Sequence, residues 1–316
     1  MKLFKPTFKK LACLLLAAVV STGFQSCKSD KKEAAEEPEK AAVIEIITED
    51  MEFQMQDTIP AGWNTFHYKN QSPQTHFFLI EKYPEGKTLD DALQAVVPVF
   101  SEGMDLINKG EFDEAMATFG NLPEWYGEVQ FLGGSGLLSP ETTGENTLKL
   151  EPGYYLIECY VKMPNGVFHT SMGMISDFVV ADKDSEIDEP EAGIAIEISG
   201  EGGIVVNDSI TAGTHTFSVL FKDQKVHENF VGHDVNLVKL EEGANLEVLE
   251  QWMNWADPKG LIEPAPEGFT FLGGVNDMPE GGIGYFTATL EPGNYALIAE
   301  VPNTMEKNML ITFEVD

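Results

Sequence analysis

Apolar and polar positions alternate over much of the chain in short segments, which is the pattern of β-strands. The segments at 41–55, 62–70 and 75–82 are rich in β-branched and aromatic residues. Residues 148–161 form two further strand-like runs joined by a Pro-Gly pair, which is a typical turn. Many short strands separated by turn residues predict a mainly β protein built as a Greek-key β-sandwich.

The segment at 88–119 departs from this strand pattern. Its apolar residues recur at helical spacing, and Thr88, followed by acidic residues, fits the N-cap of a helix. We predict two short helices here, with a break near Pro98 or Gly110. A shorter version of the same segment occurs at 245–256.

The two halves of the chain contain the same short motifs in the same order. The matched blocks are 58–66 with 209–217, 76–89 with 233–246, 131–134 with 271–274, and 150–157 with 290–298. Self-similarity of this kind indicates repeated domains. The sequence therefore predicts two tandem β-sandwich domains, at 43–181 and 194–316, with the helical insertion in the first. Residues 182–193 are predicted to be an acidic, proline-containing linker.

The N-terminal residues have the composition of an export signal. Lysines precede an apolar run at 11–20, which is too short for a stable membrane anchor. With Cys27 near its end, the segment resembles a bacterial lipoprotein signal, in which the cysteine is acylated and becomes the mature N-terminus. The resemblance implies a signal peptide at 1–26 and lipid on Cys27; ordinary secretion with cleavage nearby is the alternative. Residues 27–42 would then be a lipidated, disordered tether, because they are charged and lack aromatic residues.

Acidic residues dominate the charge of the chain. The 52 Asp and Glu residues outnumber the 20 Lys and Arg residues, and the formal net charge is −32. The chain contains no arginine, the residue best suited to bind phosphate groups. Because this charge would repel a polyanion, we predict no nucleic-acid partner. We attribute the acidity to a well-hydrated surface rather than to an acidic docking patch.

Cysteine usage draws attention to one residue of the first repeat. The other two cysteines belong to the signal peptide and the lipidation site, so Cys159 is the lone cysteine of the predicted domains. In an oxidising compartment such a thiol is either buried and inert or bound to a metal. His169 and Met174 follow Cys159 closely, and His76 lies in an earlier predicted strand.

These residues and the strands around them resemble the end of a cupredoxin domain. In that family the penultimate strand ends in a cysteine, the next loop carries a histidine, and a methionine begins the last strand. The resemblance implies one copper ion bound by His76, Cys159 and His169, with Met174 as a weak axial ligand. The Cys-x9-His-x4-Met spacing is similar to that in the copper domains of nitrite reductases. Met172 is the rival axial residue.

The second repeat lacks this ligand set. Ala299 stands at the position of Cys159, and Thr304 replaces the loop histidine, whereas His233 still aligns with His76. A type-1 copper site cannot form there without the thiolate. The persistence of His233 leaves a second interpretation open for the first repeat, in which His76 is a hydrogen-bonded strand residue and Cys159 a buried hydrophobic residue.

The predicted function is that of a lipid-anchored, cupredoxin-like protein of the cell envelope, at the outer membrane on its periplasmic face or on the cell surface. Copper in the first domain would serve electron transfer with a redox partner protein, or copper handling. The alternative is a metal-free surface lipoprotein whose sandwiches bind a partner or a ligand. The sequence has no nucleophile signature with a third orienting residue, so we assign no catalytic residues.

Overall fold

The computed structural model describes residues 43–227 and 231–316. The predicted signal peptide, the lipidation site Cys27 and the tether lie outside these residues, so they stay predictions. Within the described ranges, no helix is long and apolar enough to cross a membrane.

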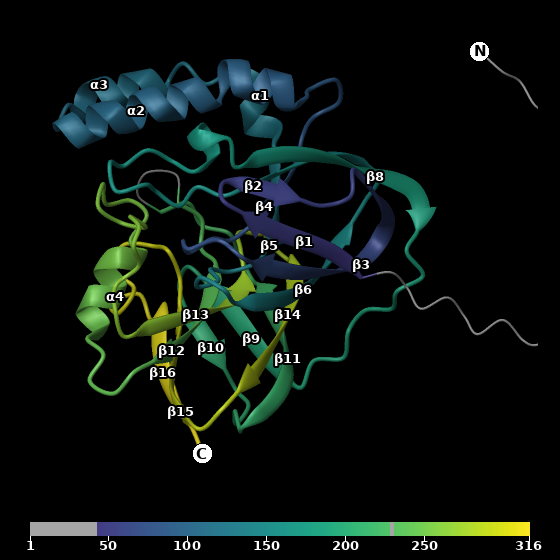
Figure 1. Cartoon of the computed structure of the whole chain (residues 1–316), viewed down its shortest axis with the longest axis vertical. Helices are drawn as coiled ribbons and strands as arrows, with labels where there is room; N and C mark the ends of the chain where they lie inside the picture. The colour runs from purple at the N-terminus through teal and green to yellow at the C-terminus, as the bar shows by residue number, and fades with distance from the viewer. Residues whose placement is uncertain (1–42, 228–230) are drawn as a thin grey trace, which may run out of the picture. The chain divides into compact units, whose positions relative to one another are not determined.

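Residues 44–184 form two β-sheets around a shared apolar core (Figure 1). The strands of one sheet lie in the order β2 (Glu52–Gln54), β1 (Ile44–Glu49), β3 (Thr58–Asn70) and β6 (Thr143–Leu150). The strands of the other lie in the order β5 (Gln130–Gly134), β4 (Leu79–Lys82), β7 (Gly153–Glu158) and β8 (Ile175–Asp184). Buried positions alternate with more exposed ones in β1, so this sheet turns one face to the core.

Strand β3 belongs to both sheets. Its first residues pair in parallel with β8, and after a register shift between Pro60 and Ala61 the remainder pairs with β1 and β6. Gly62, with a φ of +95°, permits the bend between the two parts. The shared strand therefore links the two sheets of the first sandwich along one side.

Residues 194–315 repeat this order of strands. One sheet contains β10 (Gly203–Val206), β9 (Ile194–Ser199), β11 (Gly213–Phe221) and β14 (Ile283–Leu290), and the other β13 (Phe269–Val275), β12 (Val235–Leu240), β15 (Gly293–Ile298) and β16 (Leu310–Val315). The predicted fold class, mainly β with two tandem cupredoxin-like Greek-key sandwiches, is confirmed. Because β8 continues to Asp184, the start of the predicted linker at 182–193 is part of a strand.

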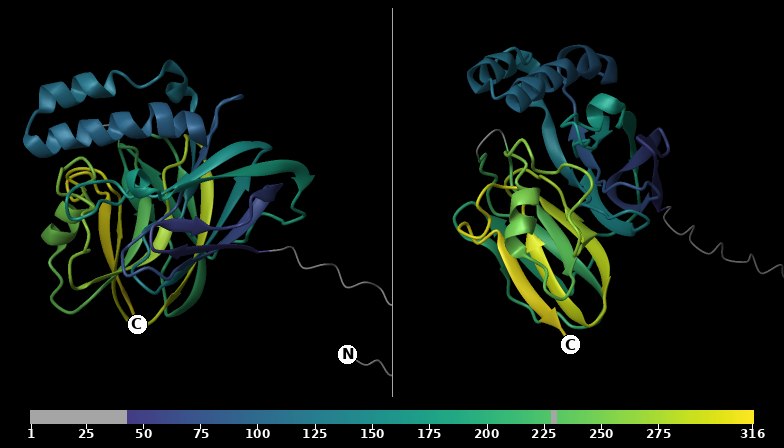
Figure 2. Two further views of the ribbon diagram at one scale, coloured as in Figure 1. Left: turned by 45° about the horizontal axis from the view of Figure 1, so that its top comes forward. Right: turned by 60° about the vertical axis from the view of Figure 1, so that its left-hand side comes forward.

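Three helices, not the predicted two, separate β4 from β5. They are α1 (Leu89–Ala95), α2 (Val97–Lys109) and α3 (Phe112–Phe119), and Figure 2 shows α2 and α3 side by side. The chain breaks at both sites that the sequence offered as alternatives. Pro98 lies in the first turn of α2, where no amide hydrogen is needed, and Gly110 adopts the left-handed conformation that ends this helix.

The predicted N-cap and the shorter second insertion are both present. The backbone amide and the hydroxyl of Thr88 each donate to the Asp91 carboxylate, at 3.0 Å, at the start of α1. In the second half the insertion is the single helix α4 (Leu246–Met253), where Asn245 accepts the amide of Glu247 at 2.9 Å. The prediction of helices in both segments is therefore confirmed, whereas the predicted number of helices in the first segment is wrong.

The two halves are joined through their edge strands. Strand β6 pairs antiparallel with β14, with Thr147 opposite Tyr285. The side-chain amide of Asn146, buried between them, donates to Gly274 O at 2.6 Å. One hydrophobic cluster also contains residues of both halves, such as Phe66 and Phe217. The halves therefore share a sheet and a core.

Candidate metal centre

Three of the four predicted ligands meet at one end of the first sandwich. His76 lies just before β4, Cys159 just after β7, and His169 near the end of the loop that leads to β8. His169 Nδ1 lies 3.2 Å from His76 Nδ1, and Cys159 Sγ lies 3.7 Å from His76 Nδ1 and 3.8 Å from His169 Nδ1. Among the described residues, this is the one group of three or more His, Cys, Asp or Glu donors that gather closely.

The spacing of these three atoms fits a metal ion. The point in their plane that is equally far from each lies about 2.1 Å away, close to the length of bonds from a first-row metal to imidazole and thiolate. A thiolate and two imidazoles in a trigonal arrangement are the donors of copper in electron-transfer sites. The donor set and its spacing therefore fit one type-1 copper ion.

A serine behind His76 supports the orientation of its ring. His76 Nε2 lies 3.0 Å from Ser72 Oγ, so an Nε2–H can donate to the hydroxyl oxygen. That tautomer leaves the Nδ1 lone pair free to face Cys159 and His169. A partner of this kind commonly fixes the tautomer and the ring orientation of a histidine ligand.

In its present orientation, the His169 ring leaves one of its two nitrogen atoms without a hydrogen bond to the described part of the chain. Its Nε2 atom is buried and has no hydrogen-bond partner among the described residues. Leaving a buried polar group unpaired costs about 1–3 kcal/mol. The backbone of His169 is held on both sides, because its amide donates to Val161 O at 2.8 Å and its carbonyl accepts the amide of Met174 at 3.0 Å. The fold therefore directs His169 Nδ1 toward the other two donors, and it leaves Nε2 without a hydrogen-bond partner in the described ranges.

Burial keeps all three donor groups uncharged without a metal. It lowers the pKa of His169 to about 4, and burial together with the neighbouring His169 lowers the pKa of His76 to about 3. Burial raises the pKa of the Cys159 thiol. The imidazole lone pairs are therefore available at neutral pH, and metal binding would release the thiol proton.

Both the backbone and the buried side chain of Met174 lie close to these donors. The amide of Cys159 donates to Met174 O at 3.2 Å, and the Met174 side chain belongs to the same apolar cluster as Cys159. Met172, the rival axial residue, is 54% exposed. An exposed thioether does not suit a metal centre whose other donors are buried, so Met174 stays our prediction for the axial ligand.

The second half provides an internal comparison. The amide of Ala299 donates to Met309 O at 3.0 Å, as the amide of Cys159 does to its methionine, so the two positions are structurally equivalent. The ring of His233 is turned to a different partner, because its Nε2 lies 2.8 Å from Asp223 O. The histidine at this position therefore has different partners in the two halves, and the Nδ1 atom of His233 lies 3.4 Å from His227 Nε2.

Residues 254–263 of the second half form a segment that covers the metal-binding end of the first half. The amide of Lys162 donates to Leu261 O at 2.8 Å, and the amide of Glu263 donates to Lys162 O at 2.9 Å. The Glu263 carboxylate also accepts the amide of Thr75, at 2.9 Å. The three candidate donors have no exposed surface. A partner protein therefore cannot touch them directly.

Sequence reasoning missed the residues that support and cover the donors. Ser72 lies behind His76, and Trp255 and Glu263 belong to the covering segment. Ser72 lies only four positions before His76, but no known motif marks it, and Glu263 and Thr75 are 188 positions apart in the sequence. The strand pattern alone therefore could not reveal them.

Comparisons with known proteins find only distant structural likenesses. No family model and no curated protein matches the chain. Reduced auracyanin from Roseiflexus castenholzii has 23% identity over 43% of this chain and 94% of its own, with a TM-score of 0.26. Auracyanin A, a blue copper protein from Chloroflexus aurantiacus, is 22% identical to this chain. The match covers 44% of this chain and 98% of auracyanin A, with a TM-score of 0.27.

A copper-containing nitrite reductase from Thermus scotoductus has 12% identity over 87% of this chain and 61% of its own, with a TM-score of 0.22. At TM-scores this low, these likenesses carry no argument about function. The strand order of the chain itself defines its fold.

Proposed function

We propose that the chain is a lipid-anchored copper protein of the cell envelope, at the outer membrane. His76, Cys159 and His169 hold one type-1 copper ion, Met174 is its weak axial ligand, and the site serves electron transfer or copper handling. The observation that carries this proposal is the convergence of one thiol and two imidazole nitrogens on a point about 2.1 Å from each.

The side chains have distinct roles in this proposal. When bound, copper supplies a one-electron redox centre whose thiolate and imidazole donors suit both of its oxidation states. Cys159 loses its proton and binds as a thiolate, and each imidazole binds through Nδ1. Complete burial of the three donors keeps water away from them.

A redox partner would exchange electrons through the cover of the site. Phe168, which precedes His169, stacks on Trp255 with ring centroids 6.0 Å apart and planes at 11°. Trp255 is only partly buried. This aromatic pair connects the ligand loop with the surface of the second half, so we place the contact of a partner there.

His169→Ala should lower the copper affinity of the chain by at least about 100-fold. Loss of a ligand costs more than the roughly 10–100-fold effect of changing a group behind a ligand. The measurement is a competition titration of the metal-free chain against a chelator of known affinity, with copper per chain determined by elemental analysis. Wild-type protein should take up one copper ion per chain.

Thr304→Ala is the matched control for this variant. The amide of Met309 donates to Thr304 O at 2.7 Å, as the amide of Met174 does to His169 O, so the two positions are equivalent. Thr304→Ala should leave copper affinity unchanged. A wild-type chain that takes up no copper would support a metal-free lipoprotein instead, whereas a His169→Ala variant that binds copper as wild type does would mean that His169 is not a ligand.

Cys27→Ser should release the protein from membranes. If lipid on Cys27 is the anchor, the variant cannot be acylated and should be found in the soluble fraction, since the described part has no spanning helix. Fractionation of cells followed by mass spectrometry of the N-terminus measures both effects. Wild-type protein recovered as a soluble, unmodified chain would contradict the anchor and leave the copper site untouched.

A further inference from the structure

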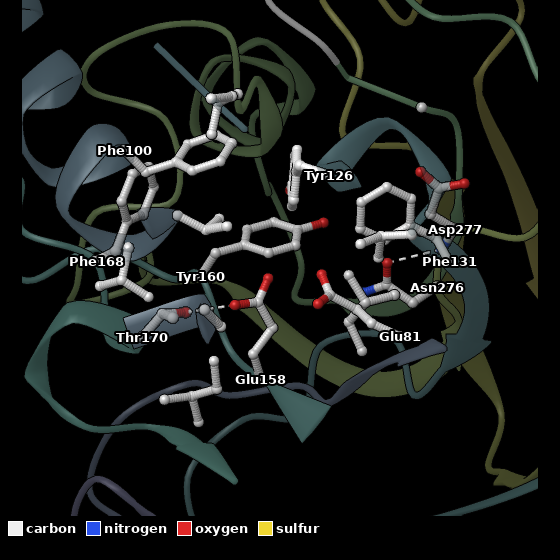
Figure 3. Close-up of a pocket in the computed structure, with 18 of the residues that line it drawn as sticks. Glu81, Phe100, Tyr126, Phe131, Glu158, Tyr160, Phe168, Thr170, Asn276 and Asp277 are labelled. Carbon is white, nitrogen blue, oxygen red and sulfur yellow. Dashed lines mark hydrogen bonds between the residues drawn. The ribbon is translucent and has the colours of Figure 1, made fainter. Parts of the chain in front are cut away.

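A cavity of about 500 Å³ lies between the helical insertion and the two halves of the chain (Figure 3). Helix α2 contributes Phe100, the first sandwich contributes Glu158 and Tyr160, and the second half contributes Trp255 and Asp277. This volume suits a small organic molecule. None of the four predicted metal ligands lines the cavity, but Glu158 and Tyr160 flank Cys159, and Phe168 and Thr170 flank His169, so the cavity is next to the metal centre.

Aromatic rings form much of the wall. They belong to Tyr83, Phe100, Tyr126, Phe131, Tyr160, Phe168 and Trp255. Tyr160 meets Trp255 edge to face with ring centroids 5.9 Å apart, and Phe168 stacks on the same tryptophan. The faces of such rings attract cations at distances up to about 6 Å, and the ammonium group of Lys162 already lies 5.6 Å from the Trp255 centroid and 5.9 Å from the Phe168 centroid.

Carboxyl groups line the same space, and no opposite charge lines it. The acidic residues are Glu81, Glu158, Asp234, Asp277 and Glu300, whereas the described lining has no lysine or histidine. Figure 3 shows the carboxyl groups of Glu81 and Glu158 pointing toward one another near the Tyr160 ring. The nearby ammonium group of Lys162 donates to the carbonyl oxygens of Trp255 and Asp257, at 3.3 and 3.1 Å. All the ionisable carboxyl and amino groups of the described lining are therefore acidic, and the nearest ammonium group is that of Lys162, which interacts with Glu300.

Two buried polar atoms of the lining lack a partner among the described residues. They are Glu300 Oε1 and Asn276 Nδ2, on side chains that are 2% and 1% exposed. The other carboxylate oxygen of Glu300 accepts the hydroxyl of Tyr160, at 3.1 Å. A buried polar atom without a partner is costly. A cation would be attracted by the charge of an ionised Glu300, whereas Asn276 Nδ2 is an N–H donor and would need an acceptor.

Burial raises the pKa of the acids in the wall, Glu300 among them, so the cavity by itself favours their neutral forms. Burial raises the pKa of Asp234 to about 7, and burial together with Asp234 raises the pKa of Asp277 to about 8. Both groups are thus partly protonated near neutral pH. A cation in the cavity would favour their charged forms.

A bare metal ion fits this cavity poorly. A metal needs several oxygen donors around one point. Among the described residues, the one close group of three or more potential ligands is the thiol and imidazole cluster, and no cavity carboxylate belongs to it. Glu81 and Glu158 form a close pair, and no three of the described acidic groups gather at one point, which suits an organic cation better than a metal ion.

We propose that this cavity binds a small organic cation, a substituted ammonium compound with an apolar body. The apolar body packs against the rings of Phe100, Tyr126 and Trp255, and the charged head is held by Glu300 and Asp277. This site does not depend on copper, so its test is independent of the proposed metal centre.

The test compares a cation with its neutral isostere on the purified full chain by isothermal titration calorimetry. Benzyltrimethylammonium is the cationic probe, and neopentylbenzene has the same shape without the charge. The wild-type chain should bind the cation at least about tenfold more tightly than the isostere. Glu300→Gln and Asp277→Asn should each weaken cation binding about tenfold and leave the affinity for the isostere unchanged.

Glu201→Gln is the control, because it removes one negative charge from an exposed turn outside the cavity. It should leave both affinities unchanged. Melting temperatures report whether each variant is folded, and Asp277→Asn replaces Glu300→Gln should the latter unfold. Equal affinity for the two probes, no binding of either, or a folded variant that binds the cation as wild type does would each overturn the proposal.

Discussion

Cys159→Ser should abolish the intense visible absorption of the copper-loaded chain. In a site of this kind the colour comes from charge transfer between thiolate sulfur and Cu(II), and a serine hydroxyl supplies no thiolate. Absorption spectra recorded after addition of one equivalent of Cu(II) to the metal-free chain measure the effect. The expected result is a strong band for wild type and none for the variant.

Ala299→Ser is the matched control for this experiment. Ala299 occupies the equivalent position after β15, and both residues are fully buried. Each substitution buries a hydroxyl, so each should cost about 1–3 kcal/mol of stability where the hydroxyl finds no partner. Only Cys159→Ser should remove the colour. A folded Cys159→Ser variant that keeps the band, or a wild-type chain that never develops one, would contradict the copper site.

The loop that carries two of the donors could be predicted because it joins neighbouring strands. Strands β7 and β8 pair antiparallel, with Glu158 opposite Ile175. The two ends of their connecting loop must therefore lie together, which places Cys159 beside Met174. The order of these residues in the sequence already contained this information, and the structure agrees with it.

His76 could be predicted only through the resemblance. It reaches the site because β4 pairs with β7, with Leu79 opposite Glu158. Strand pairing between segments so far apart is not specified by the residues of either strand alone. The alternation of apolar residues indicates which face is buried, but not which strand will be the neighbour.

The association of the two halves could not be predicted from the strand pattern. The edge strand β6 has free hydrogen-bonding groups in an isolated sandwich, and β14 pairs with it in the folded chain. The same association brings the 254–263 segment over the donors and creates the acidic cavity. The acidity was predicted to be that of a hydrated surface, yet Glu81, Asp234 and Glu300 are at most 3% exposed.

Gly134→Ala and Gly274→Ala should each destabilise the chain by at least about 4 kcal/mol, a loss that few single substitutions cause. These glycines end the two copies of the FLGG motif, in β5 and β13. A Cβ atom on Gly134 would lie 1.9 Å from Phe78 O, and one on Gly274 would lie 1.9 Å from Val235 O. A backbone oxygen in a paired strand cannot move aside as a flexible side chain can.

Denaturant unfolding measures this effect, and Gly127→Ala is the control. A Cβ atom on Gly127 would meet nothing within 4 Å, so this variant should unfold within about 1 kcal/mol of wild type. Similar losses at Gly134 and Gly274 would show that the two FLGG motifs serve the same close strand approach in both halves. A loss at only one of them would mean that the repeated motif has kept its structural role in one half alone.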